Sequence, residues 1–126
     1  MERILPGGDR PGAADSHAIG YADWLFARPA FAKARATAVA GVALLDSIAQ
    51  GTCGRPFAAC SAEERDAAIA RLEEVPHPTA QRFFADLVLL TVTGFLCAPR
   101  YGGNRGGVGW EAIGFVPHPH TEGAAR

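Results

Sequence analysis

Side chains that could bind a metal or act as nucleophiles are few and widely spaced in this chain of 126 residues. Its three cysteines, Cys53, Cys60 and Cys97, form no C-x-x-C pair, and an odd number leaves at least one unpaired within the chain. Cys97 ends an apolar run, which predicts a buried thiol. Cys53 and Cys60 flank a Gly/Pro segment, so a disulfide within this loop and a bridge to another subunit both stay open. An iron–sulfur cluster would require all three cysteines to converge in space.

The four histidines, His17, His77, His118 and His120, show no metal-binding pattern. None has the i, i+4 spacing that places two ligands on one helix face, and three of them adjoin a proline. His118-Pro119-His120 could trap adventitious metal, but a disordered tail is the stronger expectation. No serine or cysteine stands at a spacing from a histidine that suggests a catalytic dyad, and there is neither a G-x-S-x-G elbow nor a P-loop. We therefore predict no catalytic, metal-binding or cofactor-binding residue in this chain.

One segment formally matches a dinucleotide fingerprint. Residues 107–112 read Gly-Val-Gly-Trp-Glu-Ala, which fits G-x-G-x-x-A. That fingerprint binds a pyrophosphate only where a strand precedes it and a helix follows it. The sequence predicts neither here, because an apolar helix, a proline and a glycine turn come before it. Phosphate binding is therefore not expected.

This glycine-rich segment, residues 98–116, nevertheless organises the rest of the sequence. It contains three of the eleven aromatic residues, Tyr101, Trp110 and Phe115, and follows the longest apolar run. Glycine loses much backbone entropy on ordering, so a fixed conformation needs large anchors, and these aromatic rings can supply them. Flexible linkers are rich in serine, and this segment has none. We predict an ordered loop.

Composition restricts the class of protein. The length predicts a single domain over residues 1–126. A net charge of -1 without a basic block excludes the electrostatic footprint of a nucleic-acid-binding protein or of one attracted to anionic membranes. The longest apolar stretch, Leu87 to Cys97, is well short of a bilayer span, so direct membrane insertion is not expected.

Several helices must position the glycine-rich loop. Residues 1–15 are predicted to be irregular because prolines and glycines recur there. Asp15 or Ser16 can cap a helix from His17 to about Ala27, ended by Pro29. A second helix is predicted from about Phe31 to Gln50, with a buried stripe of Ala38, Val42, Leu45 and Ala49, and with Gly51 as a left-handed C-cap.

Two more helices complete residues 16–97. Ser61-x-x-Glu64 is a capping box that begins a surface helix ending at Leu72 or Glu73. Pro78 suits the first turn of a helix over Thr79 to Cys97, whose apolar residues cover most of its circumference. Such a helix is either the centre of a bundle or is covered by a partner. Sheet structure is expected at most as a short pair near Val108 to Phe115. The fold class is thus mainly α, a small irregular domain of about four helices, with a tail over 117–126.

The sequence resembles the gluconate 2-dehydrogenase subunit 3 family, the small subunits of bacterial flavin-dependent, GMC-type sugar and polyol dehydrogenases. The resemblance rests first on Tyr101-Gly102-Gly103-Asn104, then on Gly109-Trp110 and Ile113-Gly114-Phe115. It extends back to the apolar helix with Phe83-Phe84 and Thr93-Gly94-Phe95. It also includes Gly54 to Glu64, Gly41 to Gln50, and Ile4-Leu5-Pro6 with Pro11-Gly12-Ala13. The similarity covers nearly the whole chain.

The resemblance implies an accessory role in an oxidoreductase that acts on CH–OH groups. In the family the large subunit holds FAD and, in some members, an iron–sulfur cluster, and a cytochrome can accept the electrons. The small subunit has no cofactor of its own and helps the large one fold. In exported members it can carry a twin-arginine signal, which this sequence lacks as written, so a cytoplasmic location is expected. A periplasmic location remains the alternative if a leader was removed or the partner carries one.

We predict that the aromatic–glycine loop contacts the flavoprotein, because rigid aromatic side chains suit the centre of an interface. The predicted partner-binding residues are Tyr101, Gly102, Gly103, Asn104, Trp110 and Phe115, with Asn104 satisfying loop amides. Alternatively, these rings close the protein's own core. A free-standing small helical ligand-binding protein or enzyme that uses the glycine loop is the competing hypothesis.

Overall fold

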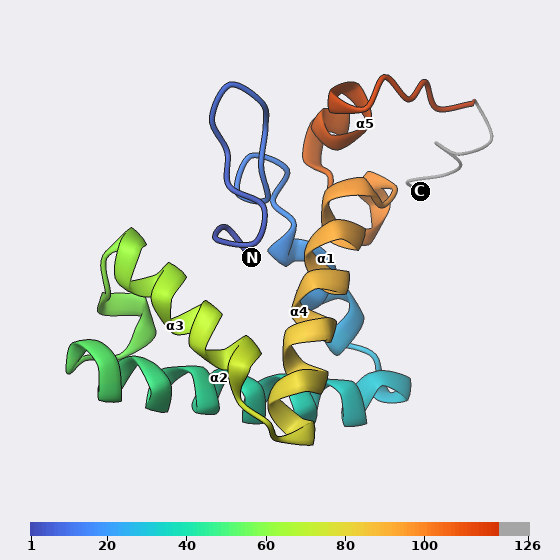
Figure 1. Ribbon diagram of the computed structural model, residues 1–126. Coiled ribbons are helices and arrows are strands. Elements are labelled where there is room, and N and C mark those ends of the chain that lie inside the picture. The colour runs from blue at the N-terminus through green and yellow to red at the C-terminus, as the bar shows by residue number, and fades with distance from the viewer. Residues whose placement is uncertain (119–126) are drawn as a thin grey trace. The chain divides into compact units, whose positions relative to one another are not determined.

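The computed structural model describes residues 1–118, and these form a mainly helical fold with no strand in that range (Figure 1). The chain forms two compact units. The first unit comprises Met1–Phe31 and Val88–Arg126, and the second comprises Ala32–Leu87. The α-helices are α1 (Ile19–Phe26), α2 (Ala32–Cys53), α3 (Ala62–Glu74), α4 (Pro78–Leu96) and α5 (Val108–Ala112). The expected mainly α fold class is confirmed, with five helices in place of about four.

The second unit has a side-chain core between α2, α3 and the first half of α4. Leu72 is fully buried, and Leu45 and Phe83 are nearly so. Small residues let these side chains approach one another: Gly41 lies directly against the ring of Phe83, and Ala68 has no exposed surface. The core therefore consists of a few large side chains packed between alanines and one glycine.

Helix α2 is longer than the sequence predicted. It continues through Gly51 to Cys53, and the residue with the left-handed backbone is Gly54, with φ of 72°. Gly51 is therefore not the C-cap, because the backbone bonds continue up to the one that Gly54 N donates to Gln50 O. The predicted stripe is partly wrong: Val42 is exposed, and Gly41 is buried together with Leu45 and Ala49. Gly41 takes the inner position because the ring of Phe83 needs that space.

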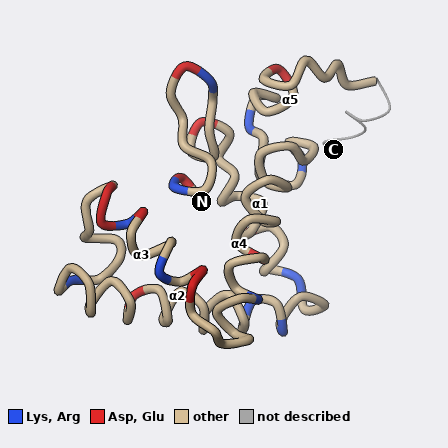
Figure 2. Tube along the Cα trace, in the orientation of Figure 1, with Lys and Arg blue, Asp and Glu red and all other residues tan. Residues whose placement is uncertain are grey.

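The start of α3 confirms the predicted capping box. The Glu64 amide donates to Ser61 Oγ at 3.2 Å, and the Ser61 amide donates to the Glu64 carboxylate at 2.7 Å. Arg55 Nη2 also contacts the second oxygen of this carboxylate at 2.6 Å. Acidic and basic residues both lie on α3, as expected for a solvated helix (Figure 2).

The three cysteines differ in state. Cys53 and Cys60 form a disulfide within the chain, which resolves the two alternatives that the sequence left open. Cys97 is a free, half-buried thiol, and its pKa is raised chiefly because burial disfavours the thiolate. The bond between Cys53 and Cys60 removes two of the three thiols that an iron–sulfur cluster would need.

In the first unit, α1 begins without the side-chain cap that the sequence predicted. The Asp15 carboxylate accepts from Gly12 N at 2.7 Å, and Ser16 Oγ donates to Ala13 O at 3.1 Å, so both stabilise the preceding turns instead. His17 has φ of 54°, outside the helical region, and α1 therefore starts at Ile19 and ends at Phe26.

Helix α4 contributes residues to both units, and several of its apolar side chains are exposed to solvent. In the first unit Thr91, Gly94 and Phe95 are buried, whereas Leu89 is 64% and Val92 is 46% exposed. By length and composition alone, Pro29–Cys53 and Pro78–Leu96 reach the size of a membrane span. That is weak evidence for insertion, because core helices of soluble proteins pass the same test.

The predicted loop over 98–116 is helical in part. It contains two 3₁₀ turns, η3 (Pro99–Tyr101) and η4 (Arg105–Gly107), followed by α5. The short strand pair that we expected near Val108 to Phe115 does not form, because the chain closes helical bonds there, and Phe115 N donates to Trp110 O at 2.8 Å. Helix α5 lies inside the G-x-G-x-x-A segment and ends with it at Ala112, so among the described residues no helix follows the segment and no strand precedes it, as expected.

Candidate functional site

Asn104 fixes the path of the glycine-rich segment. Its side chain is fully buried and its backbone is left-handed, with φ of 44°. The backbone amide donates to Gly94 O at 2.8 Å, Nδ2 donates to Cys97 O at 3.0 Å, and Oδ1 accepts from Gly109 N at 2.8 Å. Asn104 therefore connects the end of α4 to the start of α5, and the expectation that it satisfies a loop amide is confirmed.

Close backbone contacts explain why glycine is needed at two further positions. A Cβ at Gly109 would overlap the Phe95 carbonyl, and a Cβ at Gly94 would overlap the carbonyl of Ala18. Backbone atoms cannot swing away as a long side chain can, so these contacts require a residue without a side chain. The glycines therefore belong largely to the internal packing of the first unit.

Trp110 stands on α5 and connects it to α4. Its indole Nε1 donates to Leu96 O at 2.7 Å. The ring makes an edge-to-face contact with Phe115, with centroids 5.4 Å apart. Because the indole N–H already has an acceptor within the protein, the ring face offers outside molecules an apolar contact and no hydrogen bond.

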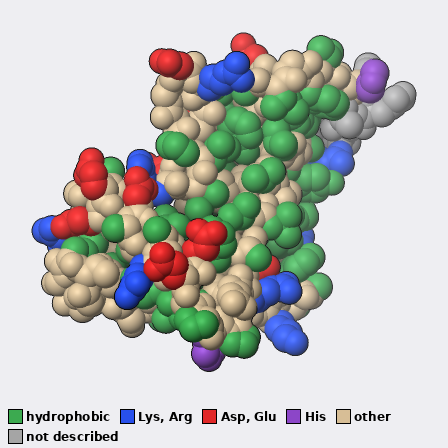
Figure 3. Space-filling model, viewed as in Figure 1, with side chains coloured by type: hydrophobic (Ala, Val, Ile, Leu, Met, Phe, Trp, Pro, Cys, Tyr) green, Lys and Arg blue, Asp and Glu red, His purple; other side chains and the backbone are tan. Residues whose placement is uncertain are grey.

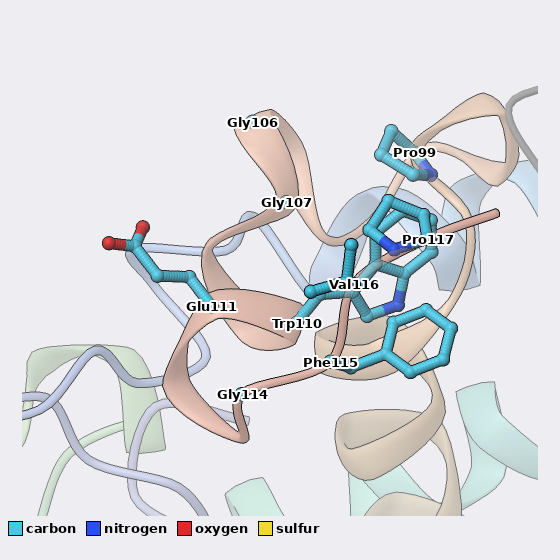
Figure 4. A pocket seen from close by; sticks show the side chains of 9 residues that line it. All are labelled: Pro99, Gly106, Gly107, Trp110, Glu111, Gly114, Phe115, Val116 and Pro117. Carbon is cyan, nitrogen blue, oxygen red and sulfur yellow. The ribbon is translucent and has the colours of Figure 1, made fainter. Parts of the chain in front are cut away.

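A hollow of about 640 Å³ lies beside these two rings (Figure 4). Apolar side chains and glycine backbone dominate its wall, and Glu111 carries the one ionisable side chain among the described residues that line it. Three apolar residues next to it are exposed: Ile113 by 61%, Phe115 by 42% and Val116 by 79%. Its lining residues are Pro99, Gly106, Gly107, Trp110, Glu111, Gly114, Phe115, Val116 and Pro117.

Tyr101 lies in a separate aromatic cluster. Its ring contacts Trp24 of α1 edge to face, with centroids 4.7 Å apart. The Arg28 guanidinium lies 3.2 Å from the centre of the Trp24 ring, and Arg28 Nη1 also donates to Trp24 O. Arg100 Nη2 donates to the Tyr101 hydroxyl at 2.9 Å. Tyr101 thus has internal contacts on its ring and on its hydroxyl.

The structure divides the six residues that the sequence predicted for partner binding. Gly103 and Asn104 are buried, and Gly102 packs against the backbone of Gly20. Tyr101 and Trp110 are partly exposed, and Phe115 is exposed. The sequence reasoning missed Ile113 and Val116, although the run Ile113-Gly-Phe-Val-Pro117 after the glycines is an apolar signal that could have identified them.

The three histidines within residues 1–118 lie in different parts of the fold. His17 lines a second hollow of about 450 Å³ with Met1, Glu2, Ala13, Ala14 and Ile19. His77 Nδ1 accepts from Thr79 N at 3.2 Å, at the start of α4. His118 is exposed, and the rest of the tail that we expected to be disordered, His120 included, lies outside the described residues.

Comparison with known proteins connects this architecture to one family. The family model described as gluconate 2-dehydrogenase subunit 3 matches residues 1–117, which includes the Asn104 connection and the hollow beside Trp110. Neither the curated proteins nor the solved structures gave a match. Because the match extends over almost the entire chain, the protein belongs to the gluconate 2-dehydrogenase subunit 3 family.

Proposed function

We propose that this protein is a non-catalytic accessory subunit that binds and stabilises the FAD-containing catalytic subunit of a bacterial sugar or polyol dehydrogenase. The observation that carries the proposal is the exposed apolar surface formed by Ile113, Phe115 and Val116 beside the Trp110 hollow. Large exposed apolar patches mark interaction sites, because leaving them in water is unfavourable. Figure 3 shows apolar side chains gathered on the viewed face of the first unit.

The chemistry of this surface favours binding over catalysis. Glu111 has no second ionisable group beside it among the described residues that line the hollow. Trp110 and Phe115 present ring surface, and aromatic residues are the side chains most enriched at the centres of interfaces. The chain then needs no activity of its own, and the oxidation of a CH–OH group is the task of the partner.

The partner supplies the cofactors in this proposal. FAD, and an iron–sulfur cluster if the complex has one, belong to the catalytic subunit, and a cytochrome receives the electrons. The compartment of the complex determines the state of Cys53 and Cys60, since a disulfide persists in the periplasm and is reduced in the cytoplasm. We keep the cytoplasm as the proposed location and the periplasm as its alternative.

Co-expression with a candidate FAD-containing catalytic subunit tests the proposal. We expect the two to co-purify with flavin absorbance, and the flavoprotein to be poorly soluble when expressed alone. Phe115→Asp should abolish co-purification, because a carboxylate would replace the exposed ring. The matched control is Val39→Asp on α2, which places the same charge at an exposed position of the second unit. A flavoprotein that is fully active without this chain would refute the proposal.

The hollow itself favours one alternative, a small-molecule site that uses the glycine loop. Its size is within the range of ligand pockets, about 300 to 1,000 Å³, and Gly106, Gly107 and Gly114 line it. Titrating the isolated chain with sugars, flavins and nucleotides while following Trp110 fluorescence tests this alternative. Saturable quenching that is lost in Phe115→Ala would support it over the accessory role.

A further inference from the structure

Two thiol sulfurs and a carboxylate meet where α2 passes into α3. Cys53 is the last residue of α2, Cys60 immediately precedes the N-cap of α3, and Glu64 is in its first turn. One ligand atom from each lies within 4.8 Å of the others. Thiolates and carboxylates are both established ligands of zinc, and thiolates select zinc over the hard cations magnesium and calcium.

The local fold holds these residues in register. Gly54, with its left-handed backbone, turns the chain after α2, and the Cα atoms of Cys53 and Cys60 are 7.0 Å apart. Two metal–sulfur bonds of about 2.3 Å are compatible with this separation. The capping box fixes Glu64, because its Oε2 accepts from Ser61 N at 2.7 Å. Cys60 is buried and Cys53 half-buried, so the site is partly shielded from water.

Backbone carbonyls surround both sulfurs and can accept from the S–H groups of the reduced cysteines. Ala49 O lies 3.1 Å from Cys53 Sγ, and Pro56 O lies 3.5 Å from Cys60 Sγ. Arg55 O lies 3.7 Å from the first sulfur and 3.8 Å from the second. Carbonyl oxygens carry partial negative charge and favour the neutral thiols over bare thiolates, so the metal ion has to displace the thiol protons and supply the compensating positive charge.

We propose that Cys53, Cys60 and Glu64 bind one zinc-class divalent cation when the two cysteines are reduced. The reductant is a dithiol of the thioredoxin class, which gives two electrons and two protons to the disulfide and itself becomes a disulfide. Metal binding then releases the two thiol protons and forms two metal–thiolate bonds and one metal–carboxylate bond, with water in the fourth position. The connection between α2 and α3 is thus crosslinked in both redox states.

The metal must compete with one existing ion pair for Glu64. Arg55 Nη2 contacts Glu64 Oε1 at 2.6 Å, but the two side chains are 50% and 31% exposed. Exposed ion pairs contribute little to stability, because water solvates the separated charges well. Oε1 can therefore turn to the metal while Oε2 keeps its bond to the Ser61 amide.

Metal titration of the reduced full chain under anaerobic conditions tests the proposal. With Co²⁺ as the probe we expect thiolate-to-metal charge-transfer absorption that saturates at one ion per chain, and Zn²⁺ should displace it. The double variant Cys53→Ser/Cys60→Ser should lose this absorption. Glu64→Gln should weaken binding by about tenfold or more, by comparison with losses at outer-shell positions. Cys97→Ser is the matched control and should bind like the wild type, because Cys97 is outside the cluster.

Three outcomes would overturn the proposal: no charge-transfer absorption in the reduced wild type, equal absorption in the double variant, or a disulfide that resists reduction in the folded protein. Equal metal binding by the oxidised wild type would also contradict it, since the sulfurs are then bonded to each other. The measurement uses this chain without a flavoprotein, so its failure is distinguishable from failure of the proposed accessory role.

Discussion

The two units of this protein differ in how far their large apolar residues are buried. In the second unit the large apolar residues Leu45, Leu72 and Phe83 are buried. In the first unit the buried apolar residues include Ala13, Ala18 and Ala22, whereas many of the large ones are exposed. These exposed large residues of the first unit are Ile19, Phe31, Leu89, Val92, Ile113, Phe115 and Val116. The second unit thus has a side-chain core of its own, whereas the first leaves more of its large apolar residues exposed.

The sources of order differ accordingly. Backbone segments of the first unit approach one another at glycines, and Asn104 supplies the hydrogen bonds that hold them. The second unit depends on burial of apolar side chains and on the disulfide. Adding a methyl group should therefore be harmful where backbones meet in the first unit, and removing methylene groups should be harmful in the core of the second.

Two probes can separate the units experimentally. Both tryptophans, Trp24 and Trp110, belong to the first unit, and the second unit contains no tryptophan. Intrinsic fluorescence therefore reports on the first unit, whereas far-ultraviolet circular dichroism reports on the helices of both. Urea unfolding followed by both signals measures each of the following predictions.

The largest effect is expected for Gly109→Ala in the first unit. A Cβ there overlaps the carbonyl oxygen of Phe95, and no flexible side chain can move aside. We expect a loss of about 4 kcal/mol in the free energy of unfolding, above the usual cost of overpacking, with an early fluorescence transition. Gly51→Ala is the matched control: it has open space and lies inside α2, so a gain of up to about 1 kcal/mol is expected. Equal effects of the two substitutions would contradict the comparison.

Asn104→Ala tests the hydrogen bonds of the first unit. The substitution leaves the Gly109 amide and the Cys97 carbonyl without their partner. Each unpaired buried group costs about 1 to 3 kcal/mol, so a total loss of about 3 to 4 kcal/mol is expected. Asn104→Asp keeps the acceptor for Gly109 but places a carboxylate against the Cys97 carbonyl, and it should also destabilise. If Asn104→Ala leaves the free energy of unfolding unchanged, these hydrogen bonds contribute nothing to stability.

Leu72→Ala tests the side-chain core of the second unit. Leu72 is fully buried, so the truncation removes apolar contacts and leaves a cavity. A loss of about 3 kcal/mol is expected from comparable leucine truncations. Because Leu72 belongs to the second unit, its truncation should lower the urea midpoint measured by circular dichroism more than the midpoint measured by fluorescence. The same truncation at exposed Leu89 is the control and should have little effect on the isolated chain.

The smallest effect is expected at the start of α3. Ser61→Ala removes the acceptor for the Glu64 amide and should cost about 1 kcal/mol. The Ser61 amide and then Arg55 lower the pKa of Glu64, so its contribution is present above the usual value of 4.5 and disappears as the pH falls through the lowered value. Glu64→Gln should therefore reduce the urea midpoint at neutral pH and have less effect in acid. An unchanged effect across this range would contradict the capping role of the carboxylate.

Local sequence signals determined much of the secondary structure. The Ser61-x-x-Glu64 box marked the start of α3, and Pro78 marked the first turn of α4, because capping bonds and proline geometry depend on residues only a few positions apart. The family resemblance also followed from the sequence, since its motifs in residues 101–115 are contiguous. The buried stripe of α2 was predicted wrongly where a distant contact decided, as at Gly41 against Phe83.

Only the tertiary structure decided which residues of the glycine-rich segment face outward. Tyr101, Asn104, Trp110 and Phe115 looked equivalent in sequence, yet Asn104 is buried between α4 and α5 while Phe115 is exposed beside the hollow. The pairing of Cys53 with Cys60 was likewise open until the turn at Gly54 brought them together. Composition and spacing determine which local hydrogen bonds a segment can form. The exposure of a side chain depends instead on which distant backbone segment packs against it, and residues nearby in the sequence do not encode that packing.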